Sequence, residues 1–336
     1  MIFNRAKIQR TVVAASVMLA SMFVLWWGIW MVAASEYRSF IDRWIEAHRA
    51  QGYTVTYDNR VTHGFPRAVS LHFTNFVLQN TDGIKIHAQD VSLSAFPWQW
   101  QRLRGKLKHG FELTIPLSDR KTLLITTDLA VRNRTELDSR GEWHFVNLEI
   151  LNARAQWGGE PFFSADKFAI AIERPLAAPK DYTQPGLVLA GSADNMTLPP
   201  GMDGPFGAHV ESLVASMRVM GPPPDPRKKD AVGAWNGAGG AVDMDQFFLK
   251  WGPLVFNAKG TLALDDDLQP EGVFSSQIGN HEAVVKTLLD NDYIPRNQAG
   301  MLNSALRLLA KQSDINGHSG IEVPITVQLG GLFLGP

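Results

Sequence analysis

The chain has 336 residues, with 32 basic and 33 acidic side chains, a formal net charge of −1 and no cysteine. This charge balance leaves no basic stripe of the kind that a phosphate backbone requires, so nucleic acid is not expected as a partner. Without cysteine the chain forms no disulfide bond. Its fold must therefore be held by burial of apolar surface, for which a chain of this length is sufficient.

An apolar stretch without charge, Thr11 to Ser35, follows a short tail that carries basic residues and no acidic one. About 20 apolar residues in a helix cross the hydrocarbon core of a bilayer, so residues 11–35 are predicted to be a transmembrane anchor. Basic tails tend to stay in the cytoplasm, whereas long domains translocate largely regardless of charge. We therefore expect a single-pass inner-membrane protein with residues 1–10 in the cytoplasm and residues 36–336 in the periplasm.

Three tryptophans, Trp26, Trp27 and Trp30, lie near the far end of this stretch. Indole rings favour the membrane–water interface, and these three are expected there. A cleavable signal peptide, cut after Ala34, is the alternative interpretation. The apolar stretch is longer than the about 7–15 residues typical of such peptides, which favours an uncleaved anchor. Both interpretations send the remaining chain to the same compartment.

Residues 36–50 are predicted to form a helix, because Tyr37, Ile41 and Ile45 recur at helical spacing and Gly52 is placed to end it. This helix is expected either to continue the anchor or to lie against the domain that follows.

Residues 53–264 alternate between apolar and polar side chains and are predicted to form a β body. Such alternation gives each strand one apolar face, and short strands separated by turn residues indicate an antiparallel sheet. A Trp-Gly-Pro outline recurs in residues 151–165 and 247–258 and favours an elongated, curved sheet built from added hairpins. The alternative is that hairpins resemble each other in any antiparallel protein. Two segments rich in Pro and Gly, 174–186 and 220–240, are expected to interrupt the sheet as loops.

Helical spacing returns in residues 280–292 and 297–313, so that 280–313 is predicted to be a helical segment, and terminal strands are expected in 321–334. The predicted fold is therefore mainly β: an elongated, curved antiparallel sheet with an N-terminal transmembrane helix and two helices near the C-terminus. An apolar helix beside a β body is expected to cover one end of its core.

No sequence pattern indicates catalysis or a cofactor. The histidines form neither an HxH nor an HExxH pattern, and residues 265–267 lack the alternating ligands of a calcium loop. Residues 317–320 lack the spacing of a nucleophile elbow. We therefore expect no enzyme, no metal and no cofactor; a periplasmic hydrolase with an unfamiliar site is the minor alternative.

The alternation instead predicts an apolar groove, because few helices are available to cover so many apolar strand faces. Such a groove would hold lipid readily, since each buried CH₂ contributes about 0.8 kcal/mol. Phospholipid or another envelope lipid is thus the expected ligand. The alternatives are that the same side chains form a closed core, or that the protein is a structural scaffold of the envelope. The candidate groove residues are Tyr57, Val69, Leu71, Phe73, Ile84, Ile86, Val91 and Leu93.

A series of short motifs runs along nearly the whole chain: Trp44, Gly52-Tyr53, Gly64-Phe65-Pro66, Trp251-Gly252-Pro253-Leu254, Gly260-Thr261-Leu262-Ala263-Leu264-Asp265 and Leu268-Gln269-Pro270. Their order resembles the uncharacterised alphaproteobacterial family catalogued as domain of unknown function two thousand one hundred and twenty-five. That family has no established activity, so the resemblance assigns no functional residue. Its members usually continue past a Leu-Gly-Pro, so this chain is expected to be slightly truncated.

The chain is more distantly similar to the AsmA-like and TamB-like envelope proteins. That similarity rests on architecture and implies an N-terminal anchor, a long curved sheet with an apolar inner face, and a lipid-handling role.

Overall fold

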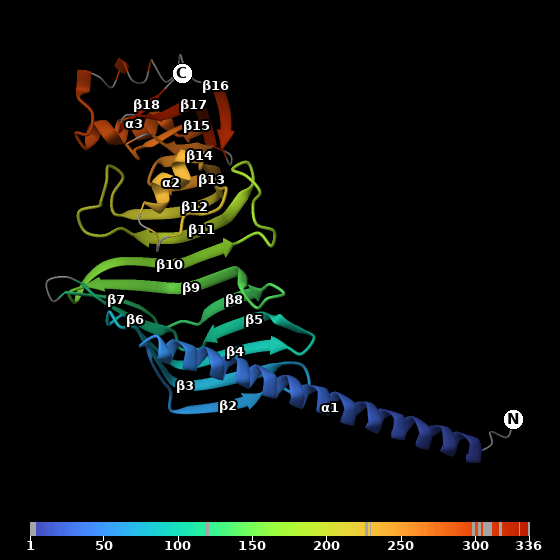
Figure 1. The fold of residues 1–336 in the computed structure, drawn as a ribbon. Coiled ribbons are helices and arrows are strands. Elements are labelled where there is room, and N and C mark those ends of the chain that lie inside the picture. The colour runs from blue at the N-terminus through green and yellow to red at the C-terminus, as the bar shows by residue number, and fades with distance from the viewer. Residues whose placement is uncertain are drawn as a thin grey trace.

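The computed structural model describes residues 5–117, 121–225, 228, 230–265, 267–297, 300, 301, 304, 311–315, 318–328 and 330–334. One helix, α1 (Arg5–Ala50), joins the predicted anchor and the predicted helix 36–50 without a break. At 1.5 Å per residue its 46 residues span about 69 Å. Figure 1 shows the N-terminal half of α1 projecting away from the sheet and its C-terminal half lying on it.

Among the described residues, the other elements with assigned bounds are eighteen strands and two shorter helices. The strands are β1 (Thr54–Thr56), β2 (Asn59–His63), β3 (Val69–Gln79), β4 (Lys85–Phe96), β5 (Gln99–Leu107), β6 (Phe111–Pro116), β7 (Thr122–Thr127), β8 (Val131–Leu137), β9 (Trp143–Trp157), β10 (Glu160–Glu173), β11 (Pro185–Thr197), β12 (His209–Met220), β13 (Val242–Trp251), β14 (Leu254–Leu264), β15 (Pro270–Gly279), β16 (Lys311–Ile315), β17 (His318–Gln328) and β18 (Gly331–Leu334). The helices are α2 (Ala231–Gly237) and α3 (His281–Asp290).

All strands belong to one antiparallel sheet in which nearly every strand pairs with the next one along the chain. At the two ends of the sheet the exceptions are β1, which pairs with β3, and β15, which pairs with β17. In the middle β5 and β6 both pair with β4, β8 and β7 both pair with β9, and β5–β8 and β6–β7 complete the ladder. Figure 1 shows the strands stacked as rungs from α1 to the C-terminal end. The predicted mainly β, elongated antiparallel fold is confirmed.

The register gives this sheet one apolar face along its whole length. Directly opposed residues share a face, so the cross-strand pairs can be followed from β3 to β17. We call the resulting line the apolar row: Leu71, Leu93, Gly105, Asn133, Leu148, Ile170, Gly191, Ala215, Phe247, Ala258, Ser276 and Val323. One residue along, the opposite face carries a largely polar line: His72, Ser92, Lys106, Arg132, Glu149, Ala169, Ser192, Val214, Phe248, Asn257, Gln277 and Glu322.

Three asparagines reset the alternation within long strands. Asn75, Asn152 and Asn195 adopt positive φ angles of 51°, 51° and 49°. Asparagine tolerates this conformation because its short side chain bonds locally, and each of the three donates its Nδ2 to an aspartate on a neighbouring segment. Around Asn75, for example, Phe73 and Phe76 pack into the same core although their spacing is odd.

The C-terminal half of α1 covers the first strands of the apolar face. Trp30, Ala34, Tyr37, Ile41 and Ile45 are buried there in one cluster with apolar residues of β3 and β4. Backbone carbonyls and charges hold the helix in place. Trp30 Nε1 donates to Ala68 O at 2.8 Å, Arg49 Nη2 donates to Val55 O at 2.7 Å, and Arg60 pairs with Asp42.

In the later part of the chain one predicted helix is confirmed and two segments differ from the prediction. The helix predicted at 280–292 is confirmed as α3, which packs over β15 and β17 through Val285, Ile321 and Val323. Most of the helix predicted at 297–313 lies outside the described residues, but its end is wrong, since residues 311–313 belong to β16. The segment 220–240 was expected to be a loop and contains α2.

Two strand boundaries also differ from the prediction. The β body does not end at residue 264, because β15 extends it to Gly279. The terminal strands begin at His318 rather than at residue 321.

Candidate functional site

A cavity of about 650 Å³ separates one flank of α1 from the sheet. Its floor comes from β3, β4, β5 and β8, and its wall from the docked part of α1. The lining is mainly aromatic and aliphatic: Tyr37, Phe40, Ile41, Trp44, Ile45, Phe73, Phe76, Val91, Leu93, Leu103, Gly105, Asn133, Thr135, Leu137, Gly141, Glu142, Trp143 and Arg174.

A second cavity of about 370 Å³ continues the first toward the part of α1 that leaves the sheet. The two share Tyr37, Phe40, Leu103 and Leu137 as lining residues. The second cavity adds Ala33, Glu36, Arg43, Val69, Ala95, Phe96, Pro97 and Trp100. We call the two together the α1 groove, because they form one apolar channel along the helix.

The Tyr37 hydroxyl is the one polar atom deep within this groove that lacks a partner. The residue is 8% exposed, and its Oη makes no hydrogen bond to any described residue. Burial also raises the pKa of this hydroxyl, which keeps it protonated as a donor. A buried hydroxyl without a partner costs about 1–3 kcal/mol, and a ligand oxygen that accepted a hydrogen bond from Tyr37 would remove this cost.

Four charged residues line the groove, and they are few beside its aromatic and aliphatic residues. Glu36 and Arg43 come from α1 and line the smaller cavity. In the larger cavity Arg174 donates to Trp143 O at 2.7 Å and lies 3.3 Å from Glu142 Oε2, with its guanidinium 4.9 Å from the Trp143 ring.

Beyond α1 the apolar face continues as a strip that is half-buried. We call this strip the trough, and it consists of Val146, Leu148, Ile170, Ile172, Leu189, Ala215, Met217, Met244 and Phe247 on β9 to β13. The trough adjoins the α1 groove directly, since the groove residues Asn133 and Thr135 are paired with Leu148 and Val146. The apolar contacts of α1 lie on β3 and β4 and those of α3 on β15 and β17. α2 meets the end of β12, where Trp235 Nε1 donates to Met220 O at 2.9 Å.

The predicted groove residues separate into three groups. Phe73, Val91 and Leu93 line the larger cavity, and Val69 lines the smaller one. Leu71 is 0% exposed beneath α1 and lines neither cavity.

The other predicted groove residues lie outside both cavities. Tyr57 packs against Phe73 with ring centroids 5.1 Å apart. Ile84 and Ile86 are half-buried near the start of β4. Sequence reasoning did not identify Tyr37, Phe40 and Leu103 as groove residues, although the first two belong to the helical stripe that was noted.

The three tryptophans of α1 have different surroundings. Trp27 is 50% exposed. Trp26 Nε1 donates to Pro66 O at 2.9 Å, and Trp30 is buried against the sheet. Two of the three therefore attach the helix to the β2–β3 turn.

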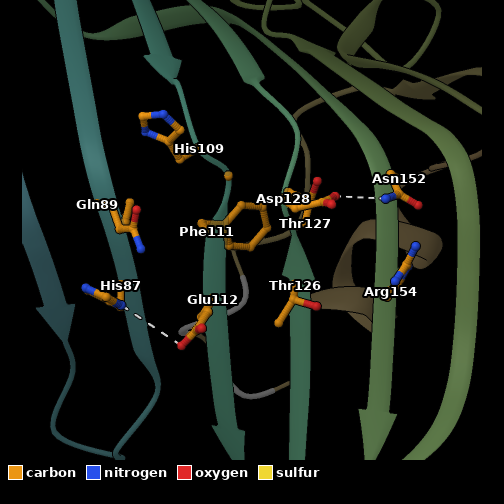
Figure 2. Close-up of a pocket in the computed structure, with 12 residues that line it drawn as sticks. His87, Gln89, His109, Phe111, Glu112, Thr126, Thr127, Asp128, Asn152 and Arg154 are labelled. Atoms are coloured by element: carbon orange, nitrogen blue, oxygen red, sulfur yellow. Dashed lines mark hydrogen bonds and ion pairs between the residues drawn. The ribbon is translucent and has the colours of Figure 1, made fainter.

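A separate polar pocket of about 350 Å³ lies where β5 gives way to β6 and β7 to β8. Figure 2 shows two partnerships across it: His87 faces Glu112, with Nδ1 4.0 Å from Oε2, and Asn152 Nδ2 donates to Asp128 at 2.8 Å. Gly110 lines the pocket at the point where the strands are split. This pocket forms because the strand pairing is interrupted here, and it is not a groove between a helix and the sheet.

One carboxylate beside this pocket joins two histidines that are far apart in the chain. Asp90 Oδ1 lies 3.0 Å from His72 Nε2, and its Oδ2 lies 2.5 Å from His109 Nδ1. The nearest hydroxyl of the pocket, on Thr127, is engaged elsewhere, since it donates to Leu151 O and accepts from Leu129 N. The described residues contain no group of three or more side chains that could hold a metal ion.

Within the described residues, α1 is the one helix that is long and apolar enough to cross a membrane, a criterion that an N-terminal signal sequence also meets. No curated protein matches the chain. A protein-family model described as "Uncharacterized protein conserved in bacteria (DUF2125)" matches residues 30–336. That match covers both the C-terminal part of α1 and the whole sheet, so the chain belongs to this bacterial family, as the motifs from Trp44 to Pro270 predicted.

Proposed function

We propose that the protein is anchored in the inner membrane by α1 and binds phospholipid acyl chains in the α1 groove and along the trough. The supporting observation is the continuity of the apolar row, which passes from the floor of the groove to half-buried side chains on strands that lie far from α1. A contiguous apolar strip of half-buried side chains is typical of a binding surface. The function is one of binding or conveying lipid, without catalysis.

Retention of the anchor is part of this proposal. A cut after Ala34 would remove Trp26 and Trp30, which bond to the β2–β3 turn, and with them part of the cover over Leu71 and its neighbours. An uncleaved α1, with its basic tail in the cytoplasm, places the β body in the periplasm. There the sheet would work on lipid of the envelope, as the architectural similarity to the AsmA-like and TamB-like proteins suggests.

Site-specific photocrosslinking of the full chain in cells tests the proposal. A photoreactive benzoylphenylalanine is placed on the apolar face at Thr135 in the groove or at Met217 in the trough. The matched controls are Arg134 and Ser216, the preceding residues, whose side chains point to the opposite face. We expect an intact-mass increase equal to one phospholipid at Thr135 and Met217 and none at the controls.

Two results would contradict the proposal. Equal lipid adducts on both faces would show contact with the membrane without a groove. Adducts to protein at Met217, with no lipid, would favour the scaffold function.

Filling the groove is expected to reduce the lipid adduct without unfolding the protein. Leu103 lines both cavities and is half-buried, so Leu103→Trp adds apolar volume to the channel rather than to the closed core. We expect the adduct at Thr135 to fall several-fold, as measured by intact mass. Val61→Trp, at a position 48% exposed on β2, is the matched control and should leave it unchanged. An undiminished adduct in Leu103→Trp would place the lipid outside the α1 groove.

Removing the Tyr37 hydroxyl is expected to increase the stability of the protein and to weaken its binding of lipid. In the lipid-free protein Tyr37→Phe should raise the free energy of unfolding by about 1 kcal/mol, because an unpaired buried hydroxyl is lost. The same variant should lower the lipid adduct at Thr135, because the ester oxygens lose a donor. Urea unfolding of delipidated protein in micelles and intact mass measure the two effects. Tyr57→Phe, outside both cavities, is the control; loss of stability in Tyr37→Phe would show that the hydroxyl already has a partner.

A further inference from the structure

We propose that the β4–β5 hairpin is a second membrane contact, which inserts its tip into the phospholipid headgroup region beside the point where α1 leaves the bilayer. The tip consists of Phe96, Pro97, Trp98, Gln99 and Trp100, between the end of β4 and the start of β5. Trp98 and Trp100 are each 55% exposed, although large aromatic side chains are normally buried.

The point at which the tip contacts α1 determines how deep the tip lies in the membrane. The ring centroids of Trp98 and Trp26 lie 5.9 Å apart, and Trp98 stacks on Phe96 with centroids 5.1 Å apart. The last charge before the apolar stretch is Arg10, so a hydrocarbon core of about 30 Å extends about 20 residues from Thr11, to Trp30. Trp26 lies four residues before that limit, about 6 Å inside it. A side chain in contact with Trp26 therefore lies among the outer part of the acyl chains, close to their boundary with the headgroups.

The exposure of α1 agrees with this depth. At the level of the hairpin and beyond, Leu25, Ile29 and Val32 are 67%, 54% and 65% exposed, so the helix still presents an apolar surface there. The β2–β3 turn lies at the same level, since the Phe65 ring is 5.7 Å from the Phe23 ring. The helix and the two loops lie at one level and must therefore share one environment. A lipid bilayer can solvate the apolar side chains of all three.

The chemistry of the tip fits a phospholipid boundary rather than the hydrocarbon centre. Indole rings combine a large apolar surface with an N–H donor and concentrate at membrane interfaces. Two cations stand beside them, as the guanidinium of Arg104 lies 4.7 Å and that of Arg67 5.8 Å from the centre of the Phe96 ring. Cations beside an anionic lipid surface add electrostatic attraction to the membrane. Trp100 also lines the α1 groove, so this contact lies at the membrane end of the groove.

Depth measurement on the full-length protein tests this inference, and the absence of cysteine makes single-site labelling direct. Trp98→Cys carries an environment-sensitive NBD fluorophore in vesicles of phosphatidylethanolamine and phosphatidylglycerol. Gln99→Cys is the second tip variant and keeps both tryptophans. Leu19→Cys, 67% exposed on α1, reports the bilayer, and Trp157→Cys, 38% exposed at the end of β9, reports the aqueous phase.

We expect both tip labels to be quenched several-fold more by headgroup-region nitroxide lipids than the Trp157 label, and to be shielded from aqueous iodide. Tip labels that match the Trp157 label while the Leu19 label is in lipid would overturn the hairpin contact alone. A Leu19 label in water would overturn the membrane anchor and the hairpin contact with it. Neither result depends on whether lipid occupies the groove.

Discussion

Leu71→Asp is expected to unfold the part of the sheet that α1 covers. Leu71 is 0% exposed, lies between Leu93 and Thr62 on neighbouring strands, and belongs to the cluster beneath α1. The variant loses the burial of a leucine, about 2–5 kcal/mol, and also places a carboxylate where water does not reach it. A typical domain is stable by only about 5–15 kcal/mol, so a loss of this size removes most of the stability.

The measurement is limited proteolysis of the full chain in micelles, which is expected to cleave β1 to β4 rapidly in Leu71→Asp. Val61→Asp is the matched control. It introduces the same charge on β2, opposite His72 on the other face of the sheet, at a site 48% exposed. We expect it to be as resistant as the unaltered protein. Equal resistance of both variants would show that α1 does not cover this face in the membrane.

This result also bears on tests of lipid binding. A charge at Leu71 or Phe73 would abolish lipid binding by unfolding the sheet and undocking α1, since both residues are almost completely buried. Leu103 is the better probe of the groove, because it lines both cavities and is half-buried.

Gly110→Ala is expected to be the most disruptive change of a glycine in the split strands. Gly110 has a φ of +74°, and a Cβ there would lie 1.7 Å from Thr127 O. That carbonyl belongs to backbone at the end of β7, and the Thr127 hydroxyl is bonded to Leu151 O, so the backbone has little room to move. The left-handed backbone alone costs about 1–2 kcal/mol, and relieving the overlap should bring the loss to about 3–5 kcal/mol.

Gly141→Ala separates these two causes. Gly141 has a similar φ of +82°, but a Cβ there meets nothing within 4 Å. We therefore expect its loss to be limited to about 1–2 kcal/mol, from backbone strain alone. Urea unfolding of both variants in micelles measures the difference. Equal losses in the two variants would mean that β6 and β7 do not pair as closely as the pairing of Phe111 with Thr127 requires.

The strands were predictable from the chain because alternation is local. Val69, Leu71 and Phe73 point to one face of any extended strand, whatever lies beside it. The register was less predictable. The positive φ angles at Asn75, Asn152 and Asn195 reverse the alternation within a strand, and nothing in a period-two pattern marks where this happens.

The candidate site was only partly predictable. Phe73, Val91 and Leu93 were named for an apolar groove and line one, whereas Leu71 is buried beneath a helix. The difference depends on α1, which approaches from a separate part of the chain. α2 was missed because its seven residues lie in a segment rich in Pro and Gly.

The sequence by itself determined the apolar N-terminal helix, the strands, the turns between them and the two-faced character of the sheet. Each of these follows from the spacing of side chains along a few neighbouring residues. Only the tertiary structure decided which part of the apolar face is covered. That outcome depends on contacts between distant segments, such as Trp30 with Ala68 and Asp42 with Arg60. Side-chain spacing shows that a face is apolar, whereas its cover depends on which other element docks there.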